Sequence, residues 1–155
     1  MITALTVSLF AMTAQVDTER LSGTSTFAII QGCVDYAEEN DLTVAIAILD
    51  DRLQMTGYFR TDNLRQGPAE LATKKADYAA RWGSDTKRLA DRVGEGSLGW
   101  ALASEGPPIE GGVPVYSEGG TLLGGVGVSG APAVEDAKCA RAGINKAGLR
   151  DSRPR

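Results

Sequence analysis

Lysine, tyrosine and arginine are the residues of this chain whose spacing suits anion binding or acid–base chemistry. Lys75 and Tyr78 lie about one turn apart on a predicted helix, and Arg60 ends the strand that precedes it. Two cations and a phenol in one place would bind an anionic ligand, or transfer a proton if the protein is an enzyme. If the protein is an enzyme, Lys75 and Tyr78 are its catalytic candidates. Arg60 and Lys75 are candidates for ligand binding. The alternatives are a surface lysine, a core tyrosine and an ion pair of Arg60 with Asp62.

A glycine-rich strand supplies the other candidates. Gly125, Gly127 and Gly130 satisfy the pattern G-x-G-x-x-G, but no second strand follows the next helix, so a dinucleotide site is not predicted. Glycines in a strand instead admit a ligand or another backbone close to the sheet. Ser129 and Gly130 precede a helix whose first amides either bind an anion or are capped locally. The further ligand-binding candidates are Gly112, Gly125, Gly127, Ser129 and Gly130.

The complete absence of histidine from the 155 residues narrows the chemistry. It excludes serine–histidine triads, histidine zinc sites and histidine ligation of haem. A formal net charge of −4 counts against nucleic acid or an anionic membrane as a partner. We predict no metal site. The cofactor is left unknown, with haem as an option that the missing histidine disfavours.

The elements that must position these residues alternate between helix and strand patterns. Helices are predicted over 25–40, 68–82, 86–93 and 132–149, strands over 42–49, 53–59, 113–116 and 121–129, and a loop over 94–112. This order predicts an α+β fold, a single domain with an antiparallel sheet of about four to five strands and helices packed on it. We divide the chain into an N-terminal extension (1–24), the α+β domain (25–149) and a polar C-terminal tail (150–155).

Cysteine usage and the N-terminus bear on location. Cys33 and Cys139 lack C-x-x-C spacing, so we interpret them as two buried free thiols in a reducing cytoplasm, and the spacing does not support a disulfide. The apolar residues 1–10 lack the basic residues of a signal peptide and are too short to span a bilayer. We interpret them as a folded N-terminus, packed on the domain or on a neighbouring subunit. A cytoplasmic protein without a membrane partner is therefore expected.

Five segments of the sequence resemble a known family in their order and spacing. They are Leu-Thr-Val-Ala-Ile-Ala-Ile-Leu-Asp (42–50), Phe-Arg-Thr-Asp (59–62), Lys-Ala (75–76), Gly-Gly-Val-Pro (111–114) and the glycine-rich run 124–130. Asp136 matches an aspartate of the last helix. Over residues 25–149 the chain resembles the haem-binding and haem-degrading family of glycolate-operon proteins, related to the C-terminal domain of propanediol-utilisation adenosyltransferases. The resemblance implies the same α+β fold, dimers or larger oligomers and, in some relatives, binding of haem or a corrinoid.

Two functions follow from these residues. The first is a small-molecule binding protein, whose pocket between the glycine-rich hairpin and the helix of Lys75 holds a flat or anionic ligand such as haem or another tetrapyrrole. The alternative is a cofactor-free acid–base enzyme of the isomerase or lyase type in a catabolic or biosynthetic pathway. Besides this ligand, further copies of the chain are expected partners, because helix 68–82 is rich in small residues that let helices approach: Ala72, Ala76, Ala79 and Ala80.

Overall fold

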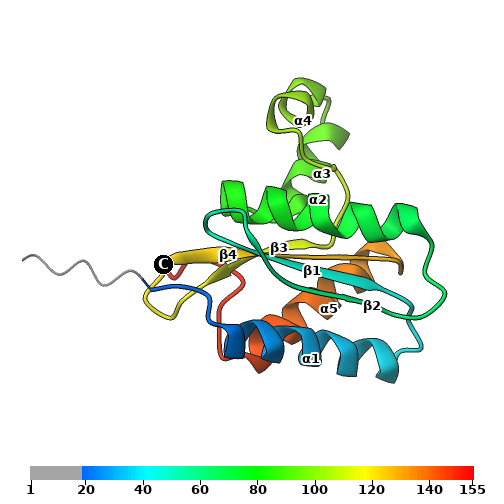
Figure 1. The fold of residues 1–155 in the computed structure, drawn as a ribbon. Helices are drawn as coiled ribbons and strands as arrows, with labels where there is room; N and C mark the ends of the chain where they lie inside the picture. Colours follow the sequence, from blue (N-terminus) through cyan, green and yellow to red (C-terminus); the bar gives the residue numbers. More distant parts are fainter. Residues whose placement is uncertain (1–18) are drawn as a thin grey trace, which may run out of the picture.

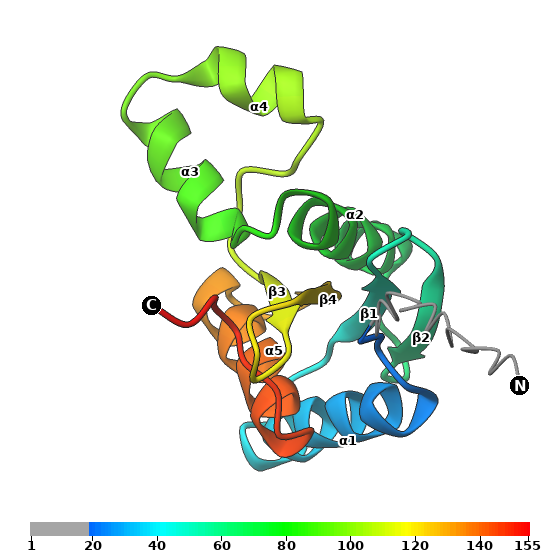
Figure 2. The same cartoon turned by 90° about the vertical axis from the view of Figure 1, so that its left-hand side faces the viewer.

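A four-stranded sheet lies between helices on both of its faces in the computed structural model, which describes residues 19–155 (Figures 1 and 2). The strand order is β2-β1-β4-β3, and every neighbouring pair is antiparallel. The strands are β1 (Ala45–Asp50), β2 (Met55–Arg60), β3 (Gly112–Tyr116) and β4 (Leu122–Ser129). The predicted α+β domain with one antiparallel sheet is confirmed. The N-terminal segment 1–10 lies outside the described residues.

Different helices cover the two faces of the sheet. The helix α2 (Gln66–Trp82) covers one face of the sheet, and α1 (Gly23–Glu39) and α5 (Ala133–Lys146) cover the other (Figure 1). None of the helices within residues 19–155 is long and apolar enough to cross a bilayer.

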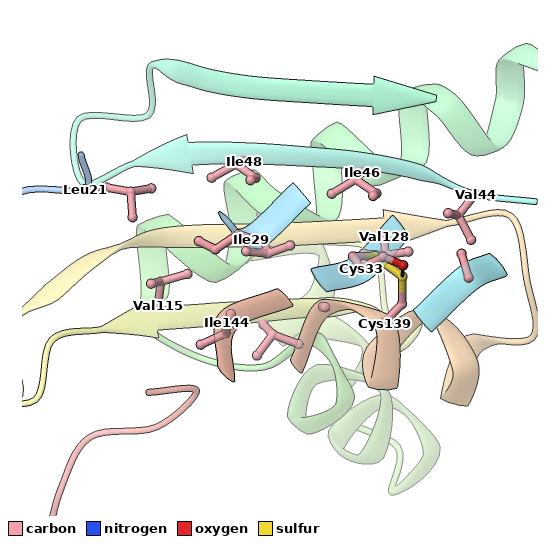
Figure 3. Close-up of a cluster of buried hydrophobic side chains, with 14 of the residues drawn as sticks. Leu21, Ile29, Cys33, Val44, Ile46, Ile48, Val115, Val128, Cys139 and Ile144 are labelled. Carbon is pink, nitrogen blue, oxygen red and sulfur yellow. Dashed lines mark hydrogen bonds between the residues drawn. A yellow bond between two sulfur atoms is a disulfide. The ribbon is translucent and has the colours of Figure 1, made fainter. Parts of the chain in front are cut away.

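The two faces of the sheet differ in side-chain size. Successive residues of a strand point to opposite faces. The alternation of isoleucine with alanine in β1, and of valine with glycine in β4, therefore puts large side chains on one face and small ones on the other. The large side chains Ile46, Ile48, Val126 and Val128 pack in the core between the sheet and α1 and α5 (Figure 3). The small face packs against alanines of α2, including Ala72 and Ala76.

The helix ends follow the expected chemistry. Gly83 ends α2 in a left-handed conformation (φ 54°), which glycine adopts without strain. The Asp85 side chain accepts a hydrogen bond from the Lys87 amide at 2.7 Å and thereby caps α3 (Thr86–Gly94). Both positions agree with the boundaries predicted for these two helices.

The segment 94–112 differs from its prediction. It contains a further helix, α4 (Leu98–Ser104), and α3 and α4 together project from the body of the domain (Figures 1 and 2). Tertiary packing holds α4 in place, because its Ala101 joins Tyr78 and Leu89 in a small buried cluster separate from the main core. A helix of only seven residues with a glycine in its first turn has too few periodic positions to be recognised in the sequence.

The cysteines form a disulfide, which corrects the prediction of free thiols. Cys33 of α1 and Cys139 of α5 are both fully buried, as predicted, but they are bonded across the two helices (Figure 3). The Cα–Cα distance is 4.5 Å, within the range for a disulfide. Gly32 and Gly143 allow this close approach, because a Cβ atom at Gly143 would collide with the backbone of Ile29. The 106-residue separation of the cysteines gives no sign of this proximity.

Candidate functional site

Lys75 lies in a buried ion pair. Its ammonium donates hydrogen bonds to Asp136 Oδ2 at 2.9 Å and to the Val128 carbonyl at 2.8 Å. Both side chains are almost completely buried. Burial lowers the pKa of Lys75 and raises the pKa of Asp136, while the attraction between the two charges opposes both shifts. The pair joins α2 to the end of β4 and the start of α5.

The start of α5 already holds an anion, which is the Asp136 carboxylate. Its Oδ1 accepts a hydrogen bond from the Ala131 amide at 3.0 Å, and it lies in the first turn of the helix. Ser129 is buried beside this turn. Gly111 passes so close that a Cβ atom there would lie 2.7 Å from the Lys75 ammonium. The sequence predicted that Ser129 and Gly130 bind a ligand at this helix start. In the structure the Asp136 side chain occupies that place.

The glycines of β3 and β4 face the backbone of α2. A Cβ atom at Gly125 would lie 2.5 Å from the Ala80 nitrogen, and one at Gly127 would collide with the Ala72 carbonyl. Likewise, a Cβ atom at Gly112 would lie 2.5 Å from the Lys75 carbonyl. The sequence left two explanations open for these glycines, a ligand or another backbone close to the sheet. In the structure it is the backbone of α2 that lies against them.

Arg60 and Tyr78 lie away from the Lys75 pair. Arg60 is opposite Ala45, which is in turn opposite Ser129, so two strand spacings, about 10 Å, separate Arg60 from Ser129. Tyr78 packs with Leu89 towards α3 and α4 and is 3% exposed. The structure therefore brings Lys75, Gly112 and Gly130 into one region, and leaves Arg60 and Tyr78 outside it.

Tyr78 instead contributes to a hollow that we call the aromatic hollow, of about 210 Å³. Its lining residues are Tyr78, Trp82, Gly83, Ser84, Arg88, Arg92 and Trp100. The rings of Trp82 and Trp100 are 5.7 Å apart between centroids, and the Arg92 guanidinium lies 5.1 Å from the Trp100 centroid. The two tryptophans remain 45% and 40% exposed, so each ring keeps surface free for a flat ligand.

A second, larger hollow adjoins the first, and we call it the arginine pocket. Its volume is about 450 Å³, and its lining residues are Gly83, Ser84, Asp85, Arg88, Pro114, Tyr116, Arg141, Asp151, Ser152 and Arg153. Gly83, Ser84 and Arg88 line both hollows. No group of three or more metal-ligating side chains occurs within residues 19–155.

Sequence reasoning missed Trp82, Arg88 and Trp100. The chain contains only two tryptophans, and both belong to the aromatic hollow. The available signal was the position of these two tryptophans, one before and one after the basic helix α3. Their meeting depends on how α4 folds back towards α2, which the sequence pattern does not contain.

The fold and these two surface hollows define a single-domain α+β protein with room for a small molecule beside α2. The chain belongs to the family described as haem degrading protein HbpS-like, whose family model matches residues 21–145. The family predicted from the sequence motifs is thereby confirmed. Protein GlcG of Escherichia coli strain K12 is 34% identical over 102 residues, which cover 66% of this chain and 75% of GlcG.

Two solved structures share the fold over most of their length. The crystal structure of the PduOC:heme complex has a TM-score of 0.79 and 25% identity, and covers 87% of this chain and all of that chain. A double mutant of Streptomyces reticuli HbpS has a TM-score of 0.74 and 25% identity, and covers 94% of this chain and 97% of that chain.

Proposed function

We propose that this protein binds a flat small molecule that carries carboxylates, of the tetrapyrrole class, and that the aromatic hollow holds the ring. One observation carries the proposal: Trp82 and Trp100 expose ring surface beside the guanidiniums of Arg88 and Arg92. Indole rings stack on flat apolar ligands, and guanidiniums bind carboxylates with two hydrogen bonds. The relative crystallised as a heme complex, and the family to which the chain belongs, support this ligand class.

The residues present suit the ring and the carboxylates of haem, but they do not suit its iron. The lining of the two hollows contains no histidine, cysteine or methionine, which are common axial ligands. Tyr78 is nearly covered, and the Tyr116 hydroxyl donates its hydrogen bond to the Gly83 carbonyl at 2.8 Å. Both cysteines are in the disulfide. We therefore infer that these two hollows recognise the porphyrin ring and its carboxylates but do not ligate the iron.

Tryptophan fluorescence tests this proposal directly, because both tryptophans of the chain line the aromatic hollow. Haemin and metal-free protoporphyrin should both quench the emission saturably, with dissociation constants that agree within a few fold. Trp100→Ala should weaken binding of either compound roughly three- to tenfold, the range expected for loss of an aromatic contact. Phe27→Ala, which removes an exposed ring on α1, is the matched control and should leave binding unchanged.

Two outcomes would overturn the proposal. Quenching by haemin alone would mean that the iron is ligated elsewhere, and equal binding by the wild type and Trp100→Ala would remove the aromatic hollow from the site.

The contacts of Lys75 and the position of Tyr78 count against the acid–base alternative. Lys75 is occupied by Asp136 and Val128, and Tyr78 lies in a different region of the molecule.

We also propose that the chain forms a homo-oligomer, with the edge strand β2 as the contact. The small residues of α2 pack inside the domain, since Ala72, Ala76 and Ala79 are fully buried. By contrast, β2 is at the edge of the sheet and exposes 51% of Met55 and 44% of Tyr58. Light scattering during size-exclusion chromatography should give a multiple of 16.3 kDa, and Tyr58→Lys should shift the mass towards the monomer. A monomer at tens of micromolar would contradict this.

A further inference from the structure

The arginine pocket carries an excess of positive charge in an acidic protein. Three arginines and two aspartates line it, whereas the whole chain has a net charge of −4. Arg141 is neutralised, because it forms ion pairs with both Asp85 and Asp151. Arg88 and Arg153 form no ion pair with any carboxylate of residues 19–155. Two guanidiniums therefore remain available to an anion.

The walls of this pocket are held in place by contacts among five parts of the chain. Arg141 of α5 reaches both the cap of α3, at Asp85, and the C-terminal tail, at Asp151. The tail is anchored to the end of β3, because Arg150 and Tyr116 exchange backbone hydrogen bonds of 2.8 and 2.9 Å. The hydrogen bond from the Tyr116 hydroxyl to Gly83 then joins β3 to the end of α2. The pocket exists before a ligand arrives, which lowers the entropic cost of binding.

We propose that the arginine pocket binds a small organic acid with at least two carboxylates, independently of the ring-binding function of the aromatic hollow. Guanidiniums match the geometry of carboxylates, and the hydroxyls of Ser84 and Ser152 add neutral donors to the lining. The volume of about 450 Å³ is within the range of pockets for organic ligands and far exceeds the needs of an inorganic ion. The C-terminal tail, through Asp151, Ser152 and Arg153, is part of this binding site.

Calorimetric titration with citrate as the probe tests the proposal at low ionic strength. Citrate should bind saturably with one site per chain. Arg153→Gln should weaken its binding at least tenfold, and Arg88→Gln should do the same. Arg155→Gln is the matched control, because it removes a guanidinium from the same tail outside the pocket lining, and it should change the dissociation constant less than twofold. Thermal melts of each variant should coincide with that of the wild type, since Arg88 and Arg153 are exposed.

Three results would overturn the proposal: no saturable citrate binding, unchanged affinity in Arg153→Gln, or an equal loss in Arg155→Gln, which would indicate diffuse charge attraction. A titration at saturating metal-free protoporphyrin identifies the source of the carboxylates. Undiminished citrate binding supports a separate organic acid. Competition would overturn the independence of the two hollows and would mean that Arg88, which lines both, holds the carboxylates of the flat ligand. Failure of protoporphyrin to bind would leave the citrate result unaffected, so the two proposals fail separately.

Discussion

At the scale of single residues, Lys75 is the position where burial changes the expected effect of a mutation most. A lysine that served only a ligand would tolerate methionine, but Lys75→Met leaves the Asp136 carboxylate buried without its partner. Breaking a buried ion pair costs about 3–5 kcal/mol of unfolding free energy. Urea unfolding should show a loss of this size. The double variant Lys75→Met, Asp136→Leu should lose less than Lys75→Met alone, because it leaves no buried charge without a partner. An equal or larger loss would contradict this account.

Gly127 is the residue at which the packing of α2 can be tested. Gly127→Ala places a Cβ atom against the Ala72 carbonyl and should lower the unfolding free energy by about 3 kcal/mol. Gly99→Ala is the control, because Gly99 lies in the helix α4 and a Cβ atom there would meet open space. That change should be neutral or slightly stabilising. Normal stability of Gly127→Ala, measured by chemical denaturation, would mean that α2 can move away from the sheet.

The candidate site could be predicted from the sequence only in part. The motif residues Lys75, Gly112 and Gly130 do meet, but which atoms occupy the space between them depends on Asp136, more than 60 residues from Lys75 along the chain. Spacing within a motif identifies positions under constraint. It does not distinguish a constraint imposed by a ligand from one imposed by a neighbouring backbone.

At the scale of elements, α3 and α4 are held to the domain by a small cluster of their own. Leu89 is fully buried between Tyr78 and Ala101, apart from the main core. Leu89→Ala should cost about 2–5 kcal/mol locally. Hydrogen exchange should show faster exchange of the amides in α3 and α4, while those of β1 and β4 remain protected. Uniform loss of protection would contradict the independence of this cluster.

Elements with strong local signals were predictable, and those that depend on tertiary contacts were not. The strand β1 lies in a continuous apolar run, and Gly83 and Asp85 mark the boundary between α2 and α3. The helix α4 has neither signal and forms because Ala101 finds the Tyr78 cluster. The aromatic hollow depends on that same placement, which explains why both were missed together.

At the scale of the whole molecule, the Cys33–Cys139 disulfide closes a loop of 106 residues. The chain-entropy account gives a loop of this length about 4.7 kcal/mol of stabilisation. The melting temperature of the wild type should therefore fall on addition of reductant. The Cys33→Ala, Cys139→Ala variant should melt at a lower temperature than the oxidised wild type, and reductant should not change its melting temperature. A wild type that melts identically with and without reductant would contradict this. Structural disulfides are typical of oxidising compartments, in contrast to the cytoplasm that free thiols would favour.

The same disulfide determines what a protease would leave behind. The projecting segment of α3 and α4 lies between the two cysteines in the sequence, and it carries basic residues such as Lys87 and Arg92 that trypsin recognises. One cut there would divide the polypeptide into two fragments that remain covalently joined. On a gel, the nicked protein would migrate as one band without reductant and as two bands with it.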